Sequence, residues 1–403
     1  DIAGFLMQYD DMMEFSFAQW FPNPPGQFNI ENYGFKENKS NPDALLMRSH
    51  ELKDQDFNIS LKCICRAGAG VNHIPIKNAT ERGVVVFNTP GGNANAVKEL
   101  VICGLLLSSR GIIQGHSFTK SLDVAVPSEL ANLVETNKKN FKGTELKGKT
   151  IGIIGLGSIG SLVAQSVDSL GMKIIGYDPN ISIDAAWQLP KEVEKAENLK
   201  YLLSNSDYIS VHVPLLDDTQ NLISKDAIKY IKKGAKLINL SRGAIVNNSD
   251  VLHALEANKI GCFVTDFPTP ELVKRSNEFS DVILLPHLGA STKEAEVNCA
   301  IMASEQAIRF LKDGEITNSV NFPKIKLGRT TKHRLVIIHK DEPGVIGNIT
   351  GEIASNNINI PDMINKSRDE IAITVIDLDE KPCQNLLNSL KNISSVLNVR
   401  ICK

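Results

Sequence analysis

The sequence predicts an α/β protein with parallel sheets, one of them doubly wound, followed by a small α+β domain. Three observations carry this prediction. Short apolar runs alternate with helix-like segments from Asn41 onward, a glycine-rich turn joins one such run to a helix near Gly155, and the last segments follow a βαββαβ order. At 403 residues the chain is long enough for two or three hydrophobic cores.

The first α/β series contains three apolar runs, ALLM at 44–47, LKCIC at 61–65 and VVVF at 84–87, and a helix is expected from Ala94 to Arg110. Strands that alternate with helices predict a parallel sheet. Residues 1–32 match no such pattern, and the sequence does not place them.

A second series starts at Thr150 and predicts the doubly wound sheet from six runs: TIGIIG, KIIGYD, YISVHV, AKLINL, CFVTDF and VILLPH. Residues 113–149 are polar and lysine-rich without a clear period, so they are interpreted as a linking region. A helix is expected from Thr292 to Gly314. After a basic connector, the runs RLVIIHK, INIPDM, AITVIDL and VLNVRI, with two helices between them, predict the βαββαβ domain.

Composition excludes several classes of function. The net charge is −2 and both signs are dispersed, which argues against a nucleic-acid partner or an anionic membrane surface. No apolar run approaches the roughly 18 residues that span a bilayer, and no leader of secretory type is present, so a trimmed start is expected. The seven cysteines lack the paired spacing of a disulfide scaffold or zinc site, which favours reduced thiols and a cytoplasmic location. No metal site is expected, because His50, His73 and His116 lack ligand partners at useful spacing.

The strongest motif is TIGIIGLGSIG, in which Gly155, Gly157 and Gly160 have GxGxxG spacing between a strand and a helix. The first glycine permits a tight turn, the second lets a pyrophosphate approach the backbone, and the third allows close helix packing. Asp178 ends the next strand, where a carboxylate binds a ribose diol and repels a 2′-phosphate. The motif therefore predicts NAD rather than NADP, although a plain turn aspartate before Pro179 is the alternative for Asp178.

Reactive side chains follow three later strands: Arg242 in SRGAIVNN, Asp266 and Glu271 in TDFPTPEL, and His287 in LLPHLGAST. Ligands bind beyond the carboxyl ends of parallel strands, so these groups are expected to converge. Oxidation of a hydroxy acid needs a base for the hydroxyl proton and a cation for the carboxylate.

We therefore interpret His287 as the acid/base, Glu271 as its partner and Arg242 as the substrate clamp. Each residue also has a structural alternative, which is a surface ion pair for Arg242, a solvated loop acid for Glu271 and a strand cap for His287.

Several blocks resemble the D-isomer-specific 2-hydroxyacid dehydrogenase family: RSHEL, RAGAGVNHIPI, FNTPGGNANAVKELV, IGLGSIG, VHVPLLDDT, INLSRGAIVN and LLPHLGASTKEAE. The resemblance runs from about Tyr33 to the end. It implies a Rossmann-type NAD domain at 113–294, inserted in a flavodoxin-like substrate domain at 1–112 and 295–325. It also implies an ACT-like regulatory domain at 332–403.

The resemblance implies NAD-dependent oxidation of D-3-phosphoglycerate to 3-phosphohydroxypyruvate, the first step of the phosphorylated route to L-serine, by a homodimer or homotetramer. It assigns the substrate's phosphate to Arg48 and Arg66 and its carboxylate to the backbone of Ala69, Gly70 and Val71. By position in the matching blocks, it assigns further cofactor contacts to Ser158, Ile159, His212, Val213, Pro214, Thr219, Leu240, Asp266, Gly289 and Ala290.

In the ACT-like domain, His339 and Asn359 match residues that bind serine in regulated family members, whereas Asp341 stands where the family has asparagine. An amino-acid effector is therefore expected, but serine itself is in doubt. The family has DVFxxEP where this chain has DFPTPEL. The spacing from Asp266 to Glu271 is the same as in the family, so Glu271 is selected as the partner of His287. The family's first strand is expected before Tyr33, where no matching run is found.

Two alternative functions are kept. One is a glyoxylate or hydroxypyruvate reductase of the same family, which acts on unphosphorylated substrates. The other is an NAD-sensing binding protein like the corepressors that resemble these dehydrogenases. Arg48 and Arg66 argue against the first, and Arg242, Glu271 and His287 argue against the second.

Overall fold

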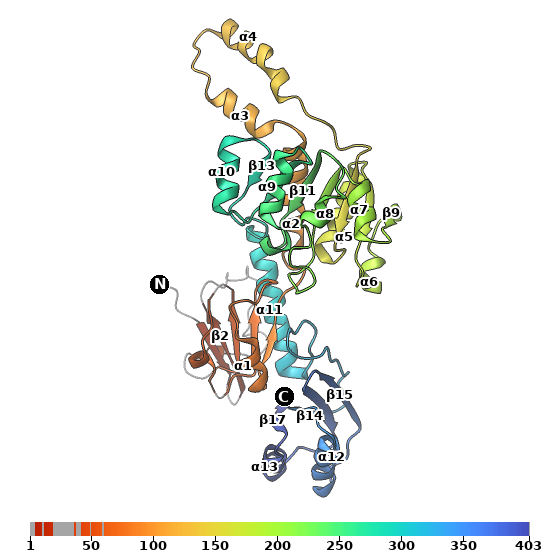
Figure 1. Ribbon diagram of the computed structural model, residues 1–403. Coiled ribbons are helices and arrows are strands. Elements are labelled where there is room, and N and C mark those ends of the chain that lie inside the picture. The colour runs from red at the N-terminus through yellow and green to blue at the C-terminus, as the bar shows by residue number, and fades with distance from the viewer. Residues whose placement is uncertain are drawn as a thin grey trace. The chain divides into compact units, whose positions relative to one another are not determined.

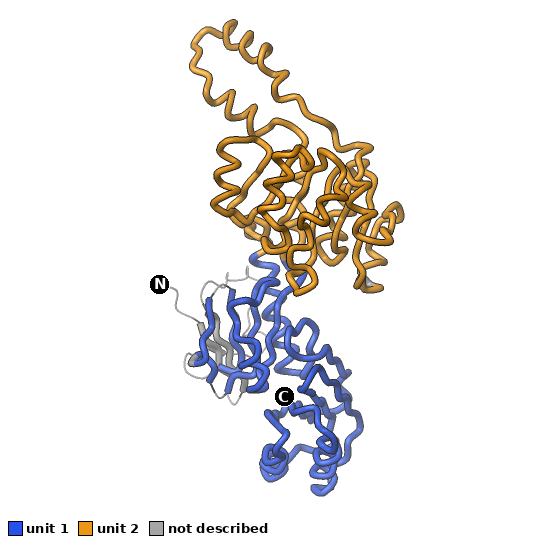
Figure 2. The backbone as a smooth tube through the Cα atoms, in the orientation of Figure 1, with its two compact units in different colours: residues 1–92, 296–403 blue, residues 93–295 orange. Residues whose placement is uncertain are grey.

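The computed structural model describes residues 5–9, 12–18, 36–37, 42–48, 50–58 and 60–402. The chain forms two compact units, shown in different colours in Figure 2. Unit 1 combines residues 1–92 with 296–403, and unit 2 consists of residues 93–295. Unit 2 therefore starts before the boundary expected at residue 113. No helix among the described residues has the length and apolarity needed to cross a membrane.

Unit 1 contains a six-stranded sheet of order β1-β3-β2-β4-β5-β6. β2 (Met12–Ala18), β4 (Ala44–Met47), β5 (Cys63–Arg66) and β6 (Val85–Phe87) are parallel. The apolar runs predict the last three of these strands. β4 and β6 are buried at every position, which explains why they read as continuous apolar runs.

The segment that the sequence did not place also contributes strands to this sheet. β2 pairs in parallel with β4, so it supplies the early strand that was not found before Tyr33. β1 (Phe5–Tyr9) is antiparallel to β2, and β3 (Lys36–Glu37) lies between them in the sheet order. The sequence alone did not locate this strand, because MMEFSFA mixes charged and apolar residues and does not match the family's block.

Unit 2 contains a seven-stranded parallel sheet of order β13-β12-β11-β10-β7-β8-β9, the doubly wound sheet that the sequence predicts. The short edge strand β9 was not predicted. The strands are β7 (Thr150–Ile154), β8 (Lys173–Tyr177), β9 (Val193–Lys195), β10 (Tyr208–Val211), β11 (Ala235–Asn239), β12 (Ile260–Thr265) and β13 (Val282–Leu284).

Helices cover the sheet of unit 2 (Figure 1). α2 (Ala94–Ser109) packs Val97, Val101 and Leu105 into the same core as β7 and β12, which is why unit 2 begins at Asn93. The other helices are α1 (Ile76–Glu81) in unit 1 and, in unit 2, α5 (Ser158–Ser169), α6 (Ile183–Ala186), α7 (Leu199–Asn205), α8 (Lys225–Ile228), α9 (Asn248–Glu256) and α10 (Pro270–Glu278). Short 3-10 turns occupy Asp54–Asp56, Lys138–Phe141 and Gly243–Ile245.

An arm of two helices replaces the expected linking region. α3 (Ile112–Lys120) and α4 (Pro127–Asn137) stand away from the sheet of unit 2 in Figure 1. Neither helix buries a residue fully. The sequence shows no clear helical period for this linking region, because an arm without a core needs few apolar residues and polar ones dilute the period.

The C-terminal segment of unit 1 has the βαββαβ order that the sequence predicts. β14 (His333–Lys340), β15 (Asp362–Arg368), β16 (Ile371–Leu378) and β17 (Val396–Cys402) form an antiparallel sheet of order β15-β16-β14-β17. α12 (Val345–Ser355) and α13 (Gln384–Asn392) share a core with its inner face. The second strand starts at Asp362, so most of INIPDM lies outside it.

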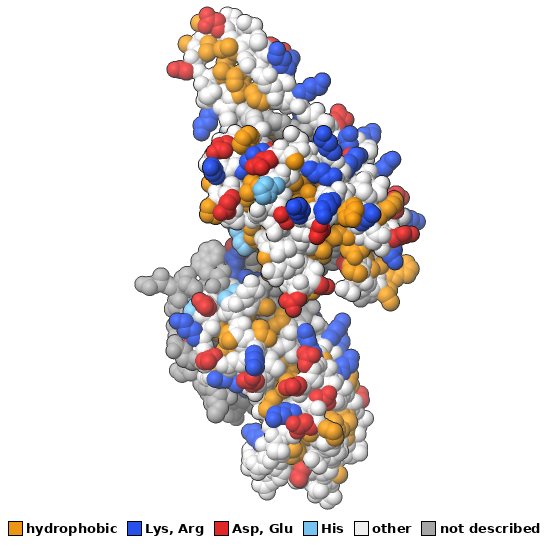
Figure 3. Space-filling model, in the orientation of Figure 1, with side chains coloured by type: hydrophobic (Ala, Val, Ile, Leu, Met, Phe, Trp, Pro, Cys, Tyr) orange, Lys and Arg blue, Asp and Glu red, His pale blue; other side chains and the backbone are white. Residues whose placement is uncertain are grey.

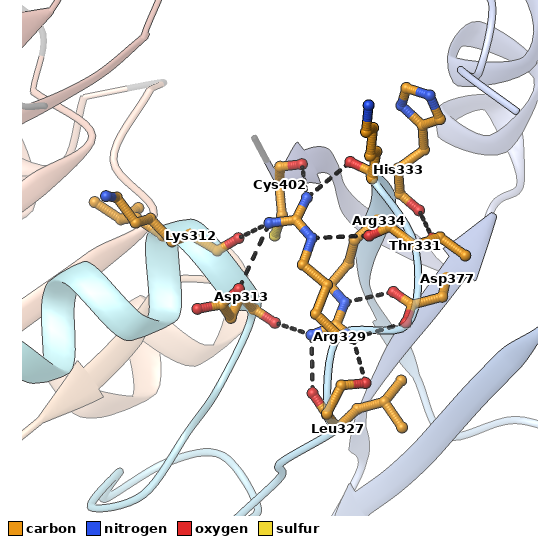
Figure 4. A network of polar contacts seen from close by, with 12 residues as sticks. Lys312, Asp313, Leu327, Arg329, Thr331, His333, Arg334, Asp377 and Cys402 are labelled. Carbon is orange, nitrogen blue, oxygen red and sulfur yellow. Dashed lines mark hydrogen bonds and ion pairs between the residues drawn. The ribbon is translucent and has the colours of Figure 1, made fainter. Parts of the chain in front are cut away.

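The other face of this small sheet is part of the main core of unit 1. Val336, Ile338 and Val375 pack in one cluster with Phe310 and Phe322, which belong to α11 (Lys293–Asp313) and the segment after it. Arg334 and Asp377, both fully buried, form an ion pair at this seam (Figure 4). All the guanidinium nitrogens of Arg334 are used, because they also donate to the carbonyl oxygens of Asp313, Leu327 and Gly328.

Candidate active site

The glycine-rich turn of unit 2 has the geometry of a dinucleotide cradle. Gly155 follows β7 at φ +90°, a conformation that side-chain-bearing residues rarely adopt. A Cβ at Gly160 would lie 2.0 Å from the carbonyl oxygen of Gly155, so only glycine fits there. A Cβ at Gly157 would meet open space, and Gly157 precedes the first turn of α5. The space above Gly157 and the helix N–H groups of Ser158 and Ile159 suit a pyrophosphate.

Asp178 lies directly after β8 and faces the same turn. Its Oδ2 accepts a hydrogen bond from the backbone N–H of Leu156 at 2.8 Å, and its Oδ1 accepts one from Asn180 at 2.9 Å. The carboxylate is therefore fixed beside the glycine-rich turn, where it has remaining acceptor capacity for a ribose diol. This geometry fits NAD.

The segment after β10 carries a neutral buried imidazole. His212 Nε2 lies 2.8 Å from Ser210 Oγ, while its buried Nδ1 has no hydrogen-bond partner. Burial lowers the pKa of His212 to about 4, so the ring is uncharged at neutral pH. Farther along, Thr219 Oγ1 donates to the carbonyl of Pro214 at 2.6 Å and shapes the loop that contains Val213 and Pro214.

Asp266, after β12, is the most buried acid among the candidates, with 1% of its surface exposed. Its Oδ2 accepts from the backbone N–H of Gly289 at 3.0 Å, and its Oδ1 has no partner within the described chain. Burial raises the pKa of Asp266, while the N–H of Gly289 and the positive charges of His287 and Arg242 oppose that rise. An unpartnered buried acceptor suits a donor on a ligand, such as a carboxamide.

His287, after β13, has a strained backbone. Its φ is 51°, whereas the other described non-glycine residues with positive φ are asparagine or aspartate, which tolerate this region better. Its N–H donates to the carbonyl oxygens of Asp266 and Leu285, and its ring lies 5.2 Å from that of Phe267. Strain of this kind is concentrated at functional sites. The imidazole is exposed, so a substrate can reach it.

Arg242, after β11, is positioned by its own strand. Asn239 Nδ2 donates to the carbonyl of Arg242 at 2.9 Å, and Arg242 Nη1 donates to the carbonyl of Ser241 at 2.6 Å. Leu240, between them, is buried against the unit 2 core. Arg242, Asp266 and His287 thus follow the adjacent strands β11, β12 and β13, and the first and last act electrostatically on Asp266, as the parallel-sheet argument predicts.

Glu271 is not brought to His287. It lies in the first turn of α10 and is exposed, and no hydrogen bond or ion pair joins it to the imidazole. Its own backbone N–H and the Thr269 hydroxyl lower the pKa of its carboxyl. The structure does not form the expected pair of Glu271 with His287, because Pro270 starts a helix here. The carboxylate of Glu271 interacts instead with its own backbone N–H in the first turn of that helix. The acid beside His287 is Asp266.

In unit 1, a loop with two arginines matches the expected substrate region. Arg66 Nε donates to the carbonyl of Arg48 at 3.1 Å, and a Cβ at Gly68 would clash with the Arg66 guanidinium. Thr89 Oγ1 accepts from Gly68 N–H at 2.6 Å, and Asn88 Nδ2 donates to the carbonyl of Ala69 at 2.8 Å. These bonds fix the loop that continues through Gly70 and Val71.

Three residues of this region were missed by sequence reasoning. Thr89 holds the loop, Glu296 forms an ion pair with Arg48, and Cys299 is close enough for both arginines to act on its pKa. Thr89 lies in a matching block, FNTPGG, which was a usable signal. Glu296 ends another matching block, LLPHLGASTKEAE, whereas Cys299 lies outside the blocks. Neither position indicates a contact with Arg48, because α11 is far from Arg48 in the sequence.

The expected effector residues do not form one hydrogen-bonded group. His339 is 1% exposed, with Nε2 2.9 Å from Thr374 Oγ1 and Nδ1 2.7 Å from the carbonyl of Lys340. Asn359 N–H donates to Asp379, and Asp341 N–H donates to the carbonyl of Glu370. Both Asn359 and Asp341 are exposed, so they are accessible to a ligand, whereas both ring nitrogens of His339 already have partners.

Comparisons with known proteins agree with this geometry. The profile of the D-isomer specific 2-hydroxyacid dehydrogenase, NAD binding domain, matches residues 103–289, which include the glycine-rich turn, Arg242, Asp266 and His287. A D-3-phosphoglycerate dehydrogenase of Haemophilus influenzae is 32% identical over 352 residues, covering 85% of this chain and 81% of the relative. The enzyme of that name from Bacillus subtilis is 36% identical over 286 residues, covering 70% and 52%.

The chain thus spans most of the first relative and about half of the second. Among solved structures, the NAD-bound 3-phosphoglycerate dehydrogenase of Entamoeba histolytica superposes with a TM-score of 0.55 at 27% identity, covering 70% of this chain and 82% of the other.

Proposed function

The chain belongs to the D-isomer-specific 2-hydroxyacid dehydrogenase family, and from this premise we propose that it oxidises D-3-phosphoglycerate to 3-phosphohydroxypyruvate with NAD, the first step of the phosphorylated route to L-serine. The observation that carries the proposal is the group Arg242, Asp266 and His287 beside an intact NAD cradle. The name shared by the relatives from H. influenzae and B. subtilis supports the substrate.

Bound NAD supplies the acceptor for a hydride. In the proposed reaction, His287 takes the proton of the substrate's 2-hydroxyl group through its exposed imidazole. Arg242 binds the substrate's carboxylate with its planar guanidinium and stabilises negative charge on the reacting oxygen. Asp266 stabilises the imidazolium that forms, because its buried carboxylate interacts electrostatically with His287.

The phosphate of the substrate is assigned to Arg48 and Arg66 in unit 1, and its carboxylate also to the backbone of Ala69, Gly70 and Val71. Two guanidinium groups on neighbouring strand ends suit a dianion, since they offer forked donors. The same pair argues against a reductase of unphosphorylated acids. Glu271, exposed in the first turn of α10, keeps a proposed role as an acid on the solvent side of the site.

The decisive experiment measures NADH formation at alkaline pH with D-3-phosphoglycerate and, separately, with D-glycerate. We expect turnover with the phosphorylated acid alone. His287→Gln should lower kcat by about 10²–10⁴-fold while leaving NAD binding unchanged, because general acid/base catalysis contributes on that order. His253→Gln, on the exposed face of α9, is the matched control and should retain full activity.

Other outcomes would assign another function. Turnover with D-glycerate alone would place the chain with the glyoxylate or hydroxypyruvate reductases. NAD binding without turnover of either acid would favour an NAD-sensing protein. Loss of NAD binding in His287→Gln would make His287 a structural residue.

A homodimer or homotetramer is supported by the arm of unit 2. Val126, Leu130, Leu133 and Val134 are 37–46% exposed and recur at the spacing of one helical face. Figure 3 shows hydrophobic side chains gathered over α4. An amino-acid effector is proposed near Asp341 and Asn359, where the carboxylate can meet an ammonium group.

A cytoplasmic location is proposed from the cysteines. All seven are free thiols, and burial raises the pKa of Cys65, Cys262 and Cys402, which keeps them protonated and unreactive. Free thiols without a disulfide framework are typical of a reducing compartment.

A further inference from the structure

The arginine that is assigned to the substrate's phosphate already holds an anion from its own chain. Arg48 Nη1 lies 2.5 Å from Glu296 Oε1, and 22% and 19% of the two side chains are exposed. A partly buried pair at this distance is stronger than a surface pair, because water screens it less. Glu296 therefore occupies at least one donor of the guanidinium fork.

The first turns of α11 present Glu296 to Arg48. Glu296 and Cys299 are three residues apart and so lie on the same side of the helix. Burial raises the pKa of the Cys299 thiol, whereas a hydrogen bond from Thr89 and the charges of Arg66 and Arg48 oppose that rise. Cys299 thus lies on the same side of α11 as Glu296 and interacts with Thr89, the residue that fixes the substrate loop.

We propose that Glu296 is a resident anion that competes with the substrate's phosphate for Arg48 and so sets how much negative charge a substrate must carry to bind. A phosphate dianion can displace the glutamate, because it carries twice the charge and three acceptor oxygens. A neutral hydroxymethyl group cannot displace it.

The proposal rests on the proposed function, because it assumes a phosphorylated substrate. It predicts that removing the charge of Glu296 changes the KM for that substrate. In Glu296→Gln the amide keeps the size of the side chain and removes its charge. We expect the KM for D-3-phosphoglycerate to fall by about tenfold with kcat nearly unchanged, since one repulsive charge near the anion is removed. The KM for D-glycerate should not fall.

The matched control is Glu294→Gln, two residues earlier on the same helix and exposed. It makes the same change in net charge without altering the Arg48 pair, so its KM should equal that of the native enzyme. In an Arg48→Gln background, Glu296→Gln should not lower the KM for D-3-phosphoglycerate, because the guanidinium for which Glu296 and the phosphate compete is gone.

Inorganic phosphate provides a probe that does not depend on turnover. Its binding to the full-length protein, measured by calorimetry, should tighten about tenfold in Glu296→Gln and by a smaller factor in Glu296→Asp. Glu296→Asp is the second variant in case the amide impairs folding, because it shortens the side chain and weakens the pair without removing its charge.

An unchanged KM and an unchanged phosphate affinity in these variants would overturn the proposal. A higher KM would also overturn it, since Glu296 would then orient Arg48 for the substrate rather than compete with it. If the native enzyme shows no turnover of D-3-phosphoglycerate, the proposed function fails. The phosphate-binding series would still decide the role of Glu296.

Discussion

At the scale of single residues, the site of unit 2 depends on groups whose environment differs from that of a surface side chain. Asp266 is a buried carboxylate with one unpartnered oxygen, and His287 has a backbone in the left-handed region. Each feature costs stability, and neither contributes to packing. Such costs are expected where chemistry requires a fixed geometry.

His212 gives a pH prediction at this scale. The unfolded imidazole takes up a proton near its ordinary pKa of about 6.5, but the folded one does so only near a pKa of about 4. Between these two pKa values the unfolded state binds more protons than the folded state, so the free energy of unfolding falls as the pH falls. From pH 7 to pH 5 we expect the free energy of unfolding to decrease by about 2 kcal/mol through this residue.

Urea unfolding at both pH values, followed by circular dichroism, measures this effect. His212→Gln should reduce the difference between pH 7 and pH 5 by about 2 kcal/mol. His253→Gln, on the exposed face of α9, should keep the native difference. The same pH dependence in His212→Gln and the native protein would show that His212 does not titrate in this way.

At the scale of elements, parallel strands explain which candidates meet. Arg242, Asp266 and His287 follow β11, β12 and β13, which are adjacent in the sheet, so their side chains emerge at one edge. Glu271 belongs to a helix instead. The motif keeps the number of residues between Asp266 and Glu271. It does not fix where the Glu271 side chain points, because α10 starts between them and changes the direction of the chain.

The seam inside unit 1 gives a prediction about elements. Arg334 on β14 and Asp377 on β16 form a buried pair, with Nε 2.6 Å from Oδ1 (Figure 4). Arg334→Met should lower the free energy of unfolding by about 3–5 kcal/mol, because Asp377 is left as an uncompensated buried charge. Urea unfolding of the full-length protein measures the change.

Two comparisons test the reason for this loss. The double variant Arg334→Met with Asp377→Leu should recover much of the stability, since no charge remains buried. Arg309→Met removes the exposed pair with Glu305 and should cost less than about 0.5 kcal/mol. Equal losses in Arg334→Met and Arg309→Met would contradict the argument from burial.

At the scale of the whole molecule, the C-terminal βαββαβ segment belongs to the same compact unit as the six-stranded sheet. Val336, Ile338 and Val375 share a core with Phe310 and Phe322, and the buried Arg400 donates to the carbonyl of Leu311 near the end of α11. The same helix carries Glu296 near its start. The residues proposed for an effector and the arginines proposed for the substrate's phosphate therefore belong to one compact unit.

This arrangement predicts the result of truncation. A chain that ends at Thr331 loses the apolar partners of the unit 1 core, each worth about 1.5–3 kcal/mol, and a domain is stable by only about 5–15 kcal/mol. We expect unit 1 to become sensitive to protease, while unit 2 stays resistant and binds NAD. Limited proteolysis with and without NAD measures both effects.

Residues 93–295 expressed alone are the control and should bind NAD with nearly native affinity, because their core is self-contained. A truncated chain that still oxidises substrate and resists protease would show that the substrate region folds without the C-terminal sheet.

The sequence by itself determined the doubly wound sheet, the NAD cradle and the catalytic candidates Arg242 and His287, because these depend on local pattern: apolar runs, glycines at fixed spacing and polar residues at strand ends. Only the tertiary structure decided that β2 joins the first sheet, that α2 belongs to unit 2 and that Glu296 meets Arg48. Those contacts join residues far apart in the chain, and no local spacing encodes which distant surfaces bury each other most favourably.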